Sequence, residues 1–169
     1  MPQIDFSTMP SSARVWVFGA AAPVVGAAHQ QLMDAVDAHL HRWAAHGVPL
    51  RCARDWRDDR FLAIAVDEAA TGASGCSIDG LFRVLTSLEG QLGTSLLDGS
   101  TVFWRDANNS IHAASRSAFK AAGVEGRIDG STTVFDTTVD SVGAWRDQFE
   151  RPAAASWHAK LIAPSSVPR

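Results

Sequence analysis

Apolar residues recur every three or four positions in two stretches of the chain, which is the spacing of an amphipathic helix. The first stretch predicts a helix over about residues 27–46, with an apolar face made of Leu32, Val36, His39, Trp43 and His46. The second predicts a helix that ends at Gly93, with an apolar face made of Leu81, Leu85, Leu88 and Leu92. Gly47 and Gly93 both suit the left-handed position that follows a helix.

Four short runs rich in β-branched and aromatic residues predict strands at 14–18, 50–57, 61–66 and 101–104. The third run is apolar at every position, which predicts a central strand buried on both faces. Asp58-Asp59 is the predicted turn between the second and third strands. Residues 111–113 are expected to return as the hairpin partner of the fourth strand.

In chain order these elements run strand, helix, strand, strand, helix, strand. This order predicts an α+β fold with a ferredoxin-like split βαβ core, in which helices cover one face of an antiparallel sheet. The remainder predicts a C-terminal hairpin and helical extension, with a helix near 115–122, a strand at 132–135 and a helix near 139–149. The predicted division is an N-terminal tail (1–12), a single domain (13–162) and a C-terminal tail (163–169), because both ends lack periodicity.

Composition narrows the classes of partner. The 169 residues carry a formal net charge of −3, which offers no electrostatic footprint for nucleic acid or an anionic membrane. Two cysteines are too few for a disulfide framework, so both are expected to be free thiols in the cytoplasm. No two histidines stand four residues apart and no Cys-x2-Cys occurs, so neither a metal nor another cofactor is expected.

The segment between the central strand and the second helix carries most of the candidate chemistry. Its small or polar residues precede a helix amino terminus, where backbone N–H groups point outward and suit an anion; they are Ser74, Gly75, Cys76, Ser77 and Asp79. The helix dipole stabilises a thiolate there, so Cys76 is also a candidate reactive thiol. The alternative interpretation is structural, with a tight glycine turn, a helix cap and a small buried cysteine.

Further candidates depend on the predicted topology. Asp67 and Glu68 end the central strand, where they can serve as acid, base or hydrogen-bond acceptor, or form a solvated strand end. His112 ends a strand that returns toward the same edge. The topology is expected to put His46 at the opposite end of the sheet from Cys76, a helix length of roughly 30 Å away.

The C-terminal residues Trp157 and His158 are expected to dock on the domain although they lie near the chain end. Two outcomes stay open. His158 can approach Cys76 or Asp79 and complete a polar site, in which case these three are the candidate catalytic residues. Otherwise Trp157 only fills space in the hydrophobic core, which we call the plug interpretation.

Several segments together resemble a small uncharacterised bacterial family. They are 43–47, 61–68, 73–79, 133–136 and 156–158, and the most specific is Ala-Ser-Gly-Cys-Ser-Ile-Asp at 73–79. Members of that family are sometimes labelled "ABC transporter ATPase". This chain contains no P-loop, because neither Lys120 nor Lys160 follows a glycine. The resemblance, which spans about residues 15–161, implies no particular reaction or ligand.

Two hypotheses from different classes follow. The first is a cytoplasmic protein that binds a small anionic ligand at the Ser74–Asp79 loop, with thiol chemistry at Cys76 as an extension. The second is a non-catalytic interaction or structural module that forms a homodimer through the uncovered sheet face, where Trp56 marks a candidate apolar patch. Both hypotheses leave open whether a reaction is catalysed.

Overall fold

The computed structural model describes residues 3–69 and 75–162, without the side chains of residues 75–77. The predicted α+β class is confirmed, since helices and antiparallel sheets are both present. The chain forms two compact units. Of the described residues, the first unit contains 3–69, 75–99 and 137–147, and the second contains 100–136 and 148–162.

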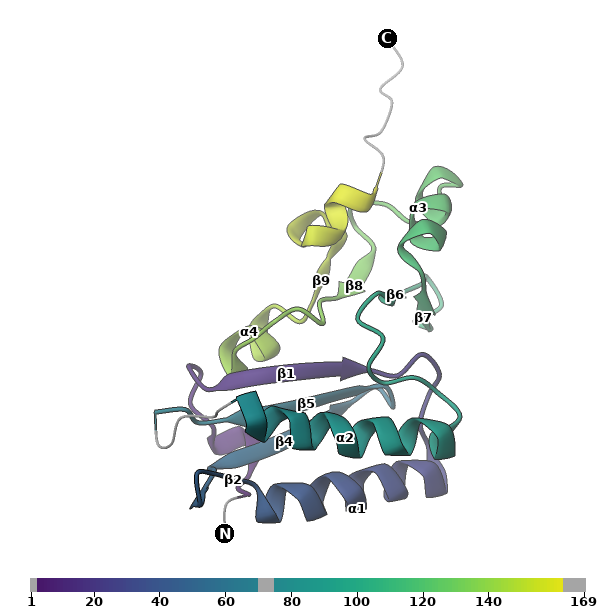
Figure 1. Ribbon diagram of the computed structural model, residues 1–169. Coiled ribbons are helices and arrows are strands. Elements are labelled where there is room, and N and C mark those ends of the chain that lie inside the picture. Colours follow the sequence, from purple (N-terminus) through teal and green to yellow (C-terminus); the bar gives the residue numbers. More distant parts are fainter. Residues whose placement is uncertain (1–2, 70–74, 163–169) are drawn as a thin grey trace. The chain divides into compact units, whose positions relative to one another are not determined.

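The first unit is built on a three-stranded antiparallel sheet in the order β1-β5-β4. Its strands are β1 (Arg14–Gly19), β4 (Cys52–Arg57) and β5 (Phe61–Val66). Two long helices, α1 (Gly26–Arg42) and α2 (Gly75–Leu92), cover one face of this sheet (Figure 1). All six residues of β5 are fully buried, which confirms the predicted central strand.

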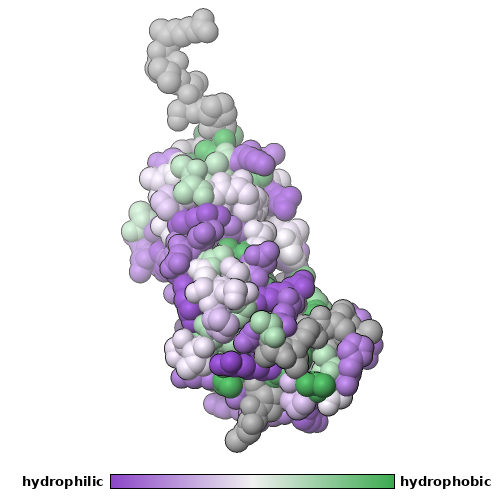
Figure 2. Space-filling model, turned by 90° about the vertical axis from the view of Figure 1, so that its left-hand side faces the viewer, coloured by the Kyte–Doolittle hydropathy of each residue, from purple (hydrophilic) through white to green (hydrophobic). Residues whose placement is uncertain are grey.

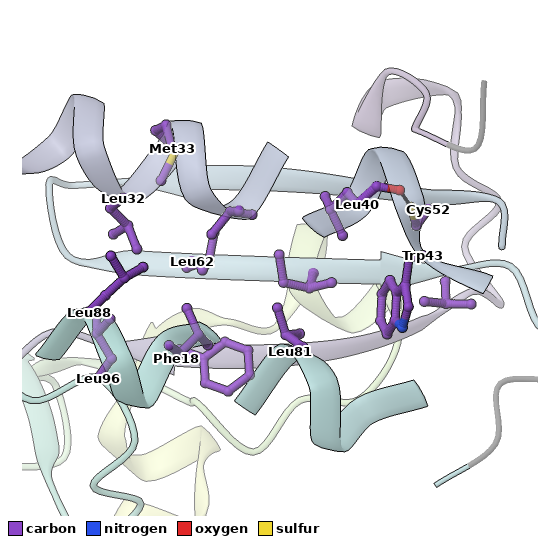
Figure 3. Close-up of a cluster of buried hydrophobic side chains, with 14 of the residues drawn as sticks. Phe18, Leu32, Met33, Leu40, Trp43, Cys52, Leu62, Leu81, Leu88 and Leu96 are labelled. Carbon is purple, nitrogen blue, oxygen red and sulfur yellow. Dashed lines mark hydrogen bonds between the residues drawn. The ribbon is translucent and has the colours of Figure 1, made fainter. Parts of the chain in front are cut away.

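The core of the first unit lies between this sheet and the two helices. Leucines from both helices meet apolar side chains of the strands there, as Figure 3 shows for Leu32, Leu62 and Leu88. Burying an aliphatic side chain contributes about 1.5–3 kcal/mol, so this cluster is the main source of stability in the unit. The remaining elements of the unit are a small hairpin of β2 (Ala44–Ala45) and β3 (Val48–Pro49), and the short helix α4 (Val142–Asp147).

The ferredoxin-like arrangement is not confirmed, because the predicted fourth strand does not join this sheet. The order β1-β5-β4 matches three strands of a split βαβ sheet. The free edge of β1, however, is occupied by the segment that leads into α4. Val15 N donates to Asp140 O at 2.9 Å, and Val142 N donates to Ala13 O at 2.9 Å. These bonds use backbone groups at the start of the β1 edge, where a fourth strand would otherwise pair.

Residues 3–12, predicted to be a tail, pack on the first unit. Gln3 forms a parallel bridge with Cys52, and Met9 is only 2% exposed. Arg146 of α4 anchors the segment through its Nη2, which donates to three backbone carbonyls, those of Phe6, Ser7 and Met9. Anchoring by carbonyl groups leaves no periodic pattern in the sequence.

The second unit has its own four-stranded antiparallel sheet, in the order β7-β6-β8-β9. Its strands are β6 (Val102–Arg105), β7 (Ile111–Ala114), β8 (Thr133–Phe135) and β9 (Glu150–Pro152), and its helix is α3 (Arg116–Val124). The predicted helix near 115–122 and the predicted hairpin of 101–104 with 111–113 are therefore present. The helix expected near 139–149 is the shorter α4, which belongs to the first unit. Among the described helices, none combines the length and the apolar character that a bilayer-crossing segment needs.

Candidate functional site

The carboxyl ends of β5 and α1 and the amino end of α2 meet at one edge of the first unit, which we call the β5 edge (Figure 1). The two helices run antiparallel. The side chain of Gln31, near the start of α1, donates to that of Gln91, near the end of α2. His39, near the end of α1, packs against Gly80, near the start of α2.

The topology corrects the expectation for His46. Residues 44–49 fold into the β2–β3 hairpin with His46 at its tip, and β2 contacts α2. His46 therefore belongs to the β5 edge and not to the opposite end of the sheet. The reason is geometric: α1 runs antiparallel to β1, so it ends on the side where β1 begins and where the antiparallel β5 ends.

Arg14 is a cation on the helix face of the β5 edge, which the sequence pattern did not indicate. It pairs in register with Val66, whose side chain lies in the core beneath the helices, so Arg14 points to the face on which α2 begins. Its guanidinium carbon lies 4.6 Å from the centre of the Trp16 ring. Its Nη1 lies 3.4 Å from Glu68 Oε1, with both side chains about half exposed. Such a long, exposed ion pair contributes little and leaves most guanidinium donors available.

An aromatic wall adjoins this arginine. The Trp16 and Trp43 ring centres are 6.4 Å apart, and the His39 ring lies 5.4 Å from that of Trp43. His39 fits because residue 80 is glycine; a Cβ at that position would lie 3.2 Å from His39 Cε1. Burial lowers the pKa of His39 below its usual 6.5, so the imidazole is neutral at pH 7. The wall is therefore uncharged beside Arg14.

Asp67 and Glu68 follow β5 as predicted, but they point to different faces of the sheet. Glu68 meets Arg14 on the helix face. Asp67 lies 3.6 Å from Arg51 and its side chain is 11% exposed. Arg51 precedes Cys52, which pairs with Val66 in the core, so Arg51 points to the opposite face. Only the Arg14 pair therefore shares the face of the α2 amino end.

The predicted loop is described in part. Ser74 lies outside the described residues. Gly75, Cys76 and Ser77 form the first turn of α2, and their side chains are likewise outside the description. Asp79 is exposed and lines a shallow hollow of about 470 Å³ along α2, together with Phe82, Arg83, Thr86 and Ser87.

His112 and His158 belong to the second unit, whereas the other predicted site residues belong to the first. His112 is exposed on β7; its Nε2 lies 2.7 Å from Asp106 Oδ2 and its ring stacks on Trp104. His158 is fully buried, which confirms the expected docking of the C-terminal segment and favours the plug interpretation.

Cys52 occupies an environment that suppresses thiol reactivity. Cys52 is fully buried in β4, and burial raises the pKa of its thiol to about 12. Its Sγ donates to the carbonyl of Leu40 at 3.5 Å. A thiol that stays protonated and inaccessible is chemically inert, so Cys52 is structural.

The surface around the β5 edge carries mainly hydrophilic residues with separate small hydrophobic spots (Figure 2). Within residues 3–69 and 75–162, no cluster of three or more His, Cys, Asp or Glu side chains is arranged to hold a metal ion. Comparisons with protein families, with curated proteins and with solved structures found no match.

Proposed function

We propose that the protein binds a small anionic ligand at the β5 edge, between the guanidinium of Arg14 and the first turn of α2. The observation that supports this most strongly is the position of Arg14, a half-exposed cation on the face where an 18-residue helix begins. A positive side chain and a helix amino terminus on one face act on an anion in the same direction.

The weak pairing of Arg14 is consistent with an exchangeable partner. Its contact with Glu68 is longer than a charge-assisted hydrogen bond, which spans about 2.7–2.9 Å. A phosphate or carboxylate that brings two oxygens can take a bidentate contact, while the backbone N–H groups of the α2 first turn have no intrahelical partner and can donate to the same ligand. The Trp16 ring beneath the guanidinium keeps it in place.

Thiol chemistry at Cys76 is an extension of this proposal. The residue occupies the first turn of α2, where the dipole favours a thiolate. The wider proposal also keeps a cytoplasmic location and the resemblance to the bacterial family described above. The competing proposal is a non-catalytic homo-oligomeric module. The sequence suggested Trp56 as its contact surface, but Trp56 is partly buried against the core of the first unit. The exposed Phe82 in the hollow along α2 is therefore the contact surface that this proposal uses.

Calorimetric titration with inorganic phosphate at low ionic strength tests the proposal. Loss of a hydrogen bond between charged groups costs about 1.5–3 kcal/mol, so Arg14→Gln weakens phosphate binding about 10- to 150-fold. Arg51→Gln is the matched control, because Arg51 also flanks the end of β5 and is half exposed but faces the other side of the sheet. Equal weakening by both substitutions would contradict the proposal.

Light scattering across protein concentrations separates the competing module. The homo-oligomer would be favoured if the molecular mass of the native chain doubled with rising concentration while Phe82→Ser stayed at the monomer mass. The same result would include no saturable phosphate binding. A monomer that binds phosphate through Arg14 favours the anion site.

A further inference from the structure

The C-terminal segment of the second unit is fastened by a buried polar cluster that the proposed anion site does not use. The Trp157 indole Nε1 donates to Asp136 Oδ1 at 3.1 Å, and Arg151 Nη2 donates to Asp136 Oδ2 at 2.7 Å. Asp136, at the end of β8, is only 3% exposed. The 3-10 helix Trp157–Leu161 is therefore tied to β8 and β9 through one carboxylate.

His158 is the most deeply buried polar residue of this cluster, with no exposed surface. Its ring stacks on Trp157 with 4.0 Å between the centres and meets Phe119 of α3 edge-on at 5.9 Å. Nδ1 lies 2.7 Å from Ser156 Oγ. Nε2 is buried and has no hydrogen-bond partner among the described residues.

This geometry accepts a neutral imidazole and disfavours an imidazolium. A proton on both nitrogens would put a charged N–H where no acceptor is present, and a buried unpaired charge is costly. The charged groups that face His158 are Asp136 beyond β8, Arg151 of β9 and Arg116 of α3. Burial disfavours the imidazolium most, Asp136 attracts it, and both arginines repel it. The two oxygens of Asp136 already accept from Arg151 and Trp157, so the carboxylate is not a hydrogen-bond partner for His158.

We propose that the docking of residues 156–161 on the second unit is an acid-released latch, in which protonation of His158 frees the segment and exposes the apolar surface of α3 and β8 that it covers.

The direction of the effect follows from linkage. Burial lowers the pKa of His158 from 6.5 to about 4 in the docked segment, whereas a released segment has the ordinary value. Docking is therefore strongest above pH 6.5 and is lost as the pH falls toward 4. Between these limits the ratio of docked to released chains falls about tenfold per pH unit, because release takes up one proton.

Hydrogen exchange of the intact chain, read by mass spectrometry from pH 7.5 to 5 and corrected for intrinsic rates, tests the latch. This range stays above the titration of ordinary carboxyl groups, near 4. Protection of the peptide over residues 153–162 is expected to fall tenfold per pH unit below about 6.5 in the native chain. In His158→Asn, which cannot take up the proton, the protection is expected to stay flat.

His46→Asn is the matched control, because His46 is exposed and has a φ of 50°, a conformation that asparagine tolerates. It keeps the pH dependence of the C-terminal peptide. An unchanged slope in His158→Asn, or flat protection in the native chain, would overturn the latch. If the variant fails to fold, the NMR titration of the His158 ring in the native chain decides: a midpoint below pH 5 supports the latch, and one near 6.5 refutes it.

Discussion

Trp145 of α4 is predicted to hold the segment that occupies the free edge of β1. Its ring is fully buried, its Nε1 donates to Asp55 Oδ2 at 2.8 Å, and the Arg57 guanidinium carbon lies 4.3 Å from its ring centre. Trp145→Phe removes the hydrogen bond to a charged acceptor, which costs about 1.5–3 kcal/mol. The smaller ring also loses buried area worth about 1 kcal/mol. The free energy of unfolding should therefore fall by about 2.5–4 kcal/mol.

Urea denaturation followed by circular dichroism measures this loss, provided that the slope of the free energy of unfolding against urea concentration is the same in each variant. A double-mutant cycle with Asp55→Ala isolates the contact, since adjacent partners couple by at least about 0.5 kcal/mol. Losses that simply add, or a loss below about 0.5 kcal/mol for Trp145→Phe, would refute the idea that this hydrogen bond anchors α4 to the sheet.

Three further predictions concern the first unit. A thiol reagent should leave Cys52 unmodified in the native chain and modify it after denaturation, because Cys52 is buried and burial raises the pKa of its thiol to about 12. Modification of Cys52 in the folded chain would contradict this. Asp59 has a φ of 55° in the β4–β5 turn, a conformation that glycine adopts without strain. Asp59→Gly should therefore stabilise the fold by about 0.5–1 kcal/mol, measured by thermal denaturation. The control Asp34→Gly should destabilise the fold, because Asp34 lies within α1 and glycine weakens a helix. The hydrogen bonds from Arg54 hold the pKa of Asp37 below 3.8, so the pair stabilises the fold above that pH and this stabilisation is lost as the pH falls through the lowered pKa. Asp37→Asn should therefore have a lower free energy of unfolding at pH 7, and that free energy should depend less on acid pH. Equal acid sensitivity of the variant and the native chain would be inconsistent with the pairing.

The regular elements of the first unit were predictable because each buries a periodic face. The stripe of Leu32 and Val36 and the unbroken apolar run of 61–66 match α1 and β5. The sheet that β6 joins was not predictable, because the sequence of a four-residue strand does not specify which sheet it pairs with. The competing partner for β1, residues 140–142, bonds through backbone groups, and any sequence can form such bonds.

The candidate site was predictable only in its position along the chain. The segment after β5 was identified from its small residues, but the cation beside it, Arg14, comes from a strand more than fifty residues earlier. Its place depends on the register of β1 against β5, which pairs Arg14 with Val66. His158 illustrates the same limit, because the burial of a residue near the chain end depends on the apolar pocket formed by α3 and β8.

The anion site at the β5 edge is tested most directly by a ¹⁵N NMR titration of the native chain with inorganic phosphate. The account predicts saturable shifts of the backbone amides of residues 75–78 and of the Arg14 side-chain N–H, with one shared affinity. It also predicts that these shifts vanish in Arg14→Gln and persist in Arg51→Gln. Shifts spread evenly over the surface arginines, or none at residues 75–78, would contradict the proposed site.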